Sequence, residues 1–128
     1  METLVELLEE AARRFQHRDA FLFKPGFRTQ RWSYGQLWEQ TGKVASILEQ
    51  RGITKGDRVV IWAPNRPEWA FAIFGCFRLG AVAVPLDVRS GSDFVQDVVA
   101  QTEPKLVFLS RFLPSSDAVG GVPSVYLE

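Results

Sequence analysis

The stretch from Lys55 to Asp87 constrains the fold of this chain more than any other. It begins with an apolar run of strand length at 58–62, and a second run follows at 81–84, where Pro85 stops it. Residues 67–79, between the two runs, are apolar nearly all round, which predicts a helix covered on most sides. Two buried strands joined by a crossover helix pair in parallel, with a right-handed connection. We therefore predict a strand–helix–strand unit at the core of an α/β layer.

The helix of this unit also has start and stop signals in the sequence. Asn65 is expected to be its N-cap, with Glu68 three residues later completing a capping box. Gly80 suits the left-handed residue that commonly ends a helix.

The rest of the chain continues the alternation of helices and strands. The further predicted elements are a helix at 3–15, a hairpin of strands 19–24 and 28–33, a helix capped by Ser33, a helix at 93–102, and strands at 106–109 and 124–127. Two strand–helix–strand units that share a strand are typical of a doubly wound parallel sheet. We divide the chain into 1–53 (helix, hairpin, helix), 55–109 (a βαβαβ unit) and 110–128 (a loop and a further strand).

Composition and charge exclude several classes of protein. Lys plus Arg and Asp plus Glu are 15 each, so nothing electrostatic favours a nucleic-acid or anionic-membrane partner. A single cysteine excludes an internal disulfide and fits a reducing compartment. The longest apolar run is too short to cross a bilayer, and no basic segment precedes the first apolar residues. These features predict a cytoplasmic protein with no transmembrane segment.

Residues that could carry chemistry are few and scattered. Cys76 lies on the apolar helix without a basic neighbour to lower its pKa, so we interpret it as a core residue. His17 stands alone in a polar segment and is predicted at the surface. No helix pattern follows Gly120-Gly121, so this pair is predicted to form a turn and not a phosphate loop. We predict no catalytic residue and no metal site.

The carboxyl ends of the strands in the central unit are where open α/β sheets bind ligands. For most of the aromatic residues core packing is favoured over a stacking or acyl-binding role. Trp62 and Trp69 flank the loop after the first strand, and for these two both roles stay open. Asp87 and Arg89 follow the second strand and belong to the same edge. They form either a solvated turn with a local ion pair or a ligand contact.

Four motifs carry a resemblance to a known family. They are Trp-Ser-Tyr-Gly-Gln-Leu at 32–37, Lys-Gly-Asp-Arg-Val at 55–59, Pro-Asn-Arg-Pro-Glu-Trp at 64–69 and Arg-Leu-Gly-Ala-Val-Ala-Val-Pro-Leu-Asp at 78–87. In order and separation they resemble the N-terminal region of adenylate-forming (AMP-binding) enzymes, most closely acyl-CoA synthetases and long-chain fatty acid–CoA ligases. The similarity covers about residues 3 to 109, and Gln36 stands where the family usually has Glu.

The resemblance implies a fold and an activity. The chain would be the N-terminal fragment of the large adenylate-forming domain. Its fold would be the first part of a doubly wound, mainly parallel sheet with flanking helices, preceded by a helix and a β-hairpin. The parent protein would be a ligase that converts a carboxylic acid, by first choice a fatty acid, to an acyl-adenylate and then to acyl-CoA. It would use ATP, magnesium and CoA.

The resemblance also implies what this chain lacks. The family's Gly-rich phosphate loop, ribose-binding Asp and C-terminal Lys match no position here, so the chain alone is predicted to be inactive and to bind no cofactor tightly. In some members the loop after the strand that matches 81–84 approaches the thiol cofactor. That makes Arg89, together with Asp87, the candidate CoA contact.

Two alternatives stay open: a stand-alone, non-catalytic α/β module for partner binding or self-association, and a fragment of a nonribosomal peptide synthetase adenylation domain. The gene downstream of codon 128 discriminates between enzyme and module, since a Gly-rich phosphate loop favours the first and a stop codon the second. The expected partner is the remainder of the parent enzyme. As an isolated fragment the chain is expected to form a homo-oligomer through uncovered apolar surface and an open sheet edge.

Overall fold

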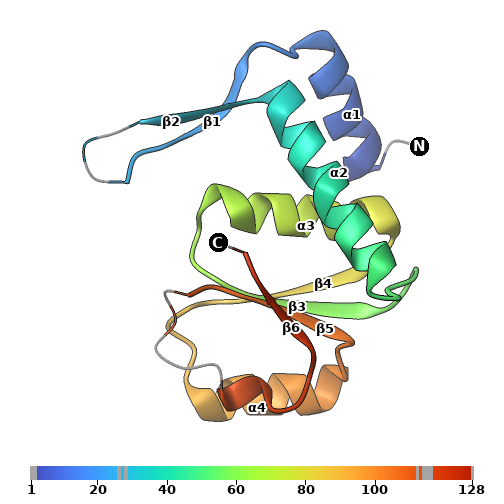
Figure 1. Ribbon diagram of the computed structural model, residues 1–128, viewed down its shortest axis with the longest axis vertical. Coiled ribbons are helices and arrows are strands. Elements are labelled where there is room, and N and C mark those ends of the chain that lie inside the picture. The colour runs from blue at the N-terminus through green and yellow to red at the C-terminus, as the bar shows by residue number, and fades with distance from the viewer. Residues whose placement is uncertain (1–2, 26, 28, 112, 114–116, 128) are drawn as a thin grey trace.

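A four-stranded sheet in the order β4-β3-β5-β6 is the centre of the fold, and each neighbouring pair in it is parallel (Figure 1). The computed structural model describes residues 3–25, 27, 29–111, 113 and 117–127. The strands are β3 (Arg58–Trp62), β4 (Val82–Leu86), β5 (Leu106–Leu109) and β6 (Ser124–Tyr126). The predicted parallel sheet is confirmed.

Helices cover both faces of this sheet (Figure 1). On one face α3 (Pro67–Leu79) packs against Val59 and Ile61 of β3. On the other face α4 (Ser92–Thr102) and the short 3-10 helix η1 (Asp117–Val119) pack near Val60 and Trp62. Successive residues of a strand point to opposite faces, so an uninterrupted apolar strand supplies both layers of core. The fold is therefore doubly wound, as the sequence predicts.

The N-terminal part of the chain packs on the outside of α3. It consists of α1 (Leu4–Arg14), an antiparallel hairpin of β1 (Asp19–Phe23) and β2 (Gln30–Ser33), and α2 (Tyr34–Gln50). Thr3 with Glu6 and Ser33 with Gln36 form capping boxes at the starts of α1 and α2. Phe71 of α3 joins Leu8 and Leu37 in a small core that holds this part to the sheet layer.

The contact between α2 and α3 is unusually close at one point. A Cβ atom built on Gly75 would lie 2.6 Å from the Cβ atom of Val44 and 3.3 Å from the carbonyl oxygen of Thr41. Nearby, the guanidinium of Arg78 lies 3.8 Å from the Trp38 ring centroid and donates a hydrogen bond of 3.0 Å to the Trp38 carbonyl. The glycine lets the helices approach, and the arginine links them beside it.

The start of α3 differs from the prediction. Arg66, not Asn65, is the N-cap residue, and its side chain makes no capping hydrogen bond. Pro67 explains the difference, because its fixed φ suits the first helical position and sets the helix start there. Glu68 accordingly faces Arg66, with 3.6 Å between Oε2 and Nε, instead of closing a capping box. Gly80 ends the helix with φ at 81°, as predicted.

None of the helices within the described ranges is long and apolar enough to cross a membrane.

Candidate functional site

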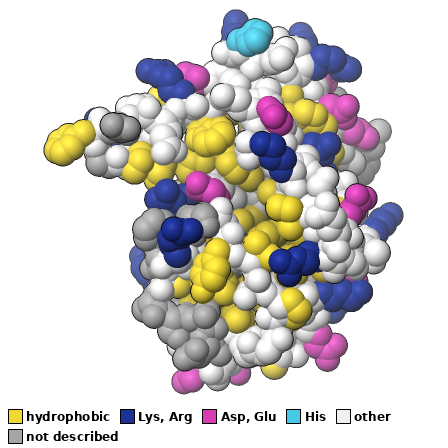
Figure 2. Space-filling view, viewed as in Figure 1, with side chains coloured by type: hydrophobic (Ala, Val, Ile, Leu, Met, Phe, Trp, Pro, Cys, Tyr) yellow, Lys and Arg dark blue, Asp and Glu magenta, His cyan; other side chains and the backbone are white. Residues whose placement is uncertain are grey.

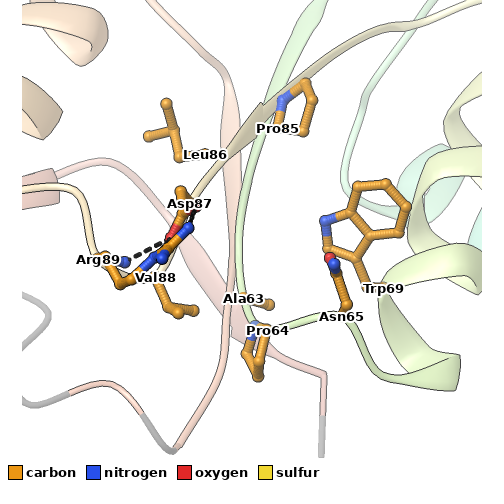
Figure 3. A pocket seen from close by; sticks show the side chains of 9 residues that line it. All are labelled: Ala63, Pro64, Asn65, Trp69, Pro85, Leu86, Asp87, Val88 and Arg89. Atoms are coloured by element: carbon orange, nitrogen blue, oxygen red, sulfur yellow. Dashed lines mark hydrogen bonds and ion pairs between the residues drawn. The ribbon is translucent and has the colours of Figure 1, made fainter.

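A cavity of about 330 Å³ opens at the carboxyl ends of β3 and β4 (Figure 3). Trp62 and Leu86, the last residues of the two strands, are register partners, so the loops that follow them lie side by side. The cavity is lined by Ala63, Pro64, Asn65, Trp69, Pro85, Leu86, Asp87, Val88 and Arg89. Figure 3 shows Asp87 and Arg89 on one side of it, with Asn65 and Trp69 facing them. The cavity lies at the carboxyl ends of the strands, where open α/β sheets bind ligands and where the sequence predicts Asp87 and Arg89 to lie.

Asp87 and Arg89 form a closed ion pair within the second loop. The Asp87 carboxylate accepts hydrogen bonds from the backbone N–H of Arg89 (2.7 Å), from its Nε (3.2 Å) and from its Nη2 (2.9 Å). Arg89 lowers the pKa of Asp87 to about 2, first through the side-chain hydrogen bonds and then through the backbone one. The Arg89 side chain is 87% exposed, so the pair stands in solvent at the cavity rim.

Of the two tryptophans in this region, Trp62 is a core residue and Trp69 lines the cavity. Trp62 is buried, and its indole nitrogen donates a hydrogen bond of 3.1 Å to the carbonyl oxygen of Asp87. It therefore belongs to the core, which settles a choice that the sequence left open, and its hydrogen bond also links the second loop to the end of β3. Trp69 is half-buried at the start of α3 and presents part of its ring to the cavity.

These groups can bind, but they do not form a catalytic set. Arg89 carries a further guanidinium nitrogen, Nη1, which takes no part in the bonds recorded to Asp87. Asn65 and Trp69 add an amide and an aromatic ring. Such a rim suits an anionic or amide-bearing ligand. Among the residues that the structure describes, no group of three or more His, Cys, Asp or Glu residues could hold a metal ion.

The other sequence candidates lie elsewhere in the fold. Cys76 is fully buried among apolar side chains, and burial raises the pKa of its thiol to about 12, so it is the predicted core residue. Gly120-Gly121 forms a turn that leads into β6, and a strand offers no helix N-terminus to a phosphate. His17 is exposed in the turn after α1, as predicted.

Sequence reasoning missed two features of the site. The sequence predicts Asn65 as the N-cap of α3, whereas the structure places it in the cavity wall. The Trp62 hydrogen bond to Asp87 joins residues 25 apart, and only the strand register brings them together. The position of Asn65 and Trp62 in the sequence could have indicated both features, because these residues lie at or just beyond the end of the predicted strand 58–62.

Comparisons with known proteins give one consistent family. The model of the AMP-binding enzyme family matches residues 8–125. Acetyl-coenzyme A synthetase of Alcanivorax borkumensis is 50% identical over 50 residues, which are 39% of this chain and 8% of that protein. Long-chain-fatty-acid–CoA ligase FadD13 of Mycobacterium tuberculosis is 32% identical over 92 residues, which are 72% of this chain and 18% of the ligase.

Solved structures agree on the fold. The N-terminal subdomain of NpsA from Klebsiella oxytoca, in complex with 3-hydroxybenzoyl-AMSN, superimposes with a TM-score of 0.83 at 22% identity. The match covers 99% of this chain and 30% of that structure. The chain thus spans only a small part of the length of the relatives it matches.

Proposed function

The chain belongs to the AMP-binding enzyme family, and we propose that it supplies the N-terminal part of an ATP-dependent ligase acting on carboxylic acids. The reaction would convert the acid to an acyl-adenylate and then to a thioester of CoA. The family match, which runs through nearly the whole chain, is the observation that carries this proposal. The similarity to an acetyl-coenzyme A synthetase and to FadD13 favours acyl-CoA formation, with a fatty acid as first-choice substrate.

The described residues do not fit ATP and magnesium. Adenylation needs preorganised donors for the triphosphate and charge neutralisation at the α-phosphate. The adjacent glycines lead into a strand, and the described residues contain no cluster of metal ligands. We therefore propose that the chain alone catalyses nothing and that the remainder of the enzyme holds the nucleotide.

CoA is the cofactor that the site could touch. We propose that Arg89 contacts a CoA phosphate through Nη1 while Asp87 holds its guanidinium in place. The exposure of Arg89 and the ion-pair geometry at the cavity rim support this role. Because Asp87 neutralises the arginine and water screens both, the contact is expected to be weak, with CoA affinity near millimolar.

Calorimetry with CoA tests this contact. Arg89→Ala is expected to abolish the binding, and Asp87→Asn to strengthen it several-fold by removing the competing carboxylate. Arg31→Ala is the matched control, since Arg31 forms another exposed ion pair with Asp19, 3.0 Å between Nη1 and Oδ2, on the hairpin. CoA binding that is equal in Arg89→Ala and the parent chain would exclude the proposed contact.

A covalent chimera tests the ligase assignment. The 92 residues of this chain that align with FadD13 from Mycobacterium tuberculosis would replace the segment that they match, and a deletion of that segment would be the control. We expect pyrophosphate release and acyl-CoA formation with fatty acids from the chimera only. A folded chimera without pyrophosphate release would refute the assignment, and release with amino acids alone would favour the peptide synthetase alternative. Pyrophosphate from the isolated 128-residue chain would contradict its proposed inactivity.

Two further proposals concern the cellular location of the chain and its self-association. We propose that it is cytoplasmic, because its single cysteine is free and buried, which suits a reducing compartment. We also propose that the isolated chain self-associates, because exposed apolar side chains lie on several of its elements. Sedimentation that shows a monomer at high micromolar concentration would refute the second proposal.

A further inference from the structure

The cavity at the carboxyl ends of β3 and β4 has an aromatic wall opposite its arginine (Figure 3). This wall is the side chain of Trp69, which packs in part against the core between α3 and the sheet and in part lines the cavity. The core contact holds the ring in place whether or not a ligand is present. Flat heterocycles stack on such a ring, and nucleic-acid bases of every kind do so.

The side-chain amide of Asn65 lies beside this aromatic wall (Figure 3). Asn65 is exposed, and its amide makes no hydrogen bond to another described residue. An asparagine amide carries an acceptor and donors side by side. It therefore pairs with adenine through two neighbouring atoms, the N6 donor and the N7 acceptor, whereas guanine presents acceptors at both positions. A stacking ring next to a free amide matches adenine better than it matches an acyl chain.

Size and charge limit the ligand further. Small-molecule pockets measure about 300–1,000 Å³, and this cavity of about 330 Å³ lies at the lower end of that range, which suits a group of nucleoside size. Figure 2 shows basic and acidic side chains interspersed over the face in view, and the chain has 15 of each sign. Nucleic acids bind where basic side chains gather, so a single small nucleotide is favoured over a polymer.

Arg89 supplies a phosphate contact on the opposite side of the cavity. Its side chain is 87% exposed, and its Nη1 takes no part in the hydrogen bonds to Asp87. Guanidinium nitrogens are preferred donors to phosphate oxygens. Figure 3 shows Arg89 and Asp87 facing Asn65 and Trp69 across the cavity, so a base on Trp69 and a phosphate at Arg89 would span it.

We propose that this cavity recognises an adenosine phosphate group, with adenine stacked on Trp69, its N6/N7 edge bonded to Asn65 and a phosphate at Arg89. The group belongs to CoA or to a free adenine nucleotide, and it is separate from the nucleotide that the remainder of the enzyme holds for adenylation. The inference deepens the proposed function and rests on it for CoA as one source. It makes Asn65 and Trp69 the residues that select the base.

The test titrates the 128-residue chain with AMP and with inosine 5′-monophosphate, in which a carbonyl replaces the 6-amino group. Binding is followed by NMR, which measures millimolar affinities, at the indole N–H signals. The parent chain is expected to bind AMP about tenfold more tightly, because the Asn65 oxygen loses its donor in the inosine compound. The Trp69 indole signal should shift, whereas that of Trp62, which is buried and hydrogen-bonded to Asp87, should not.

Variants separate the three contacts. Asn65→Ala should remove the preference for AMP, Trp69→Leu should weaken both nucleotides about tenfold, and Arg89→Ala should weaken both equally and keep the preference. Gln101→Ala is the matched control, since Gln101 is an exposed amide on α4 that does not line the cavity, and it should change neither affinity. Asn65 is exposed, so its variant should keep the parent melting temperature, and an unchanged Trp62 indole signal checks the fold of Trp69→Leu.

The outcomes separate this inference from the ligase assignment. A preference for AMP that Asn65→Ala abolishes and Gln101→Ala keeps supports the adenine site. Equal affinity for the two nucleotides, a preference that survives Asn65→Ala, or no binding of either overturns it. With the site supported, tighter binding of CoA than of AMP identifies CoA as the source, and equal binding identifies a free nucleotide. An active covalent chimera without base preference would keep the ligase assignment and overturn the adenine site, and an inactive chimera with this preference would do the reverse.

Discussion

Replacing Gly75 with alanine tests the close contact between α2 and α3, which joins the N-terminal part of the chain to the sheet. The new Cβ would lie 2.6 Å from the Val44 Cβ, whereas carbon atoms pack at about 3.5–4.0 Å, so the helices must separate by about 1 Å. The opposite side of α3 is fixed, because Ala72 and Cys76 are fully buried against the sheet. Overpacking of this kind costs about 1–3 kcal/mol, and the better helix propensity of alanine offsets up to about 1 kcal/mol.

We therefore expect Gly75→Ala to lower the free energy of unfolding by about 1–2 kcal/mol, measured by urea titration followed by circular dichroism. Gly42→Ala is the matched control at the same helix contact. Its Cβ would crowd only the Nη1 atom of Arg78, at 3.0 Å, and a shift of a few tenths of an ångström lets that atom keep its hydrogen bond to the Trp38 carbonyl. The free energy of unfolding should therefore change by less than about 1 kcal/mol. A Gly75→Ala protein as stable as the parent, or more stable than Gly42→Ala, would refute the close packing of the two helices.

Three further substitutions or titrations test local features. Ser33→Ala removes the capping box at the start of α2 and should lower the free energy of unfolding by about 1 kcal/mol in the same urea titration. An unchanged free energy of unfolding would show that the cap does not form. Trp62→Phe keeps most of the buried ring but deletes the hydrogen bond to the Asp87 carbonyl, so about 1 kcal/mol of stability should be lost. Faster amide exchange at Arg89 should accompany it, and unchanged exchange would show that the bond does not hold the loop. The pKa of Asp87, followed by NMR, should lie near 2, and Arg89→Ala should return it toward 3.8. Because this pKa is lowered in the folded chain, the small stabilisation from the pair should be complete above about pH 4 and lost as pH falls through about 2. Equal titration curves in the parent and in Arg89→Ala would show that the ion pair does not form in solution.

The candidate site was predictable in position but not in detail. Trp69, Asp87 and Arg89 follow predicted strand ends, and parallel strands put those ends on one edge, so their neighbourhood could be read from the sequence. The sequence left an ion pair and a ligand contact as alternatives for Asp87 and Arg89. The structure shows the ion pair, whereas the CoA contact stays a proposal.

The elements of this fold are determined by local signals in the sequence. Apolar runs of strand length at β3 and β5, the capping boxes at Thr3 and Ser33, and the glycine that ends α3 each act within a few residues of chain. Such signals survive without tertiary context, because steric limits and backbone hydrogen bonding decide them. The element order then leaves few topologies, and right-handed crossovers select the doubly wound sheet.

Only the tertiary structure decided what depends on contacts between distant segments. The Trp62 hydrogen bond requires the register of β3 against β4, and the need for glycine at position 75 appears only when α2 is placed against α3. The exposure of apolar side chains is decided in the same way. An apolar side chain at position 47 or 125 has the same sequence signature whether a neighbour covers it or not, and the covering layer is a property of the assembled fold.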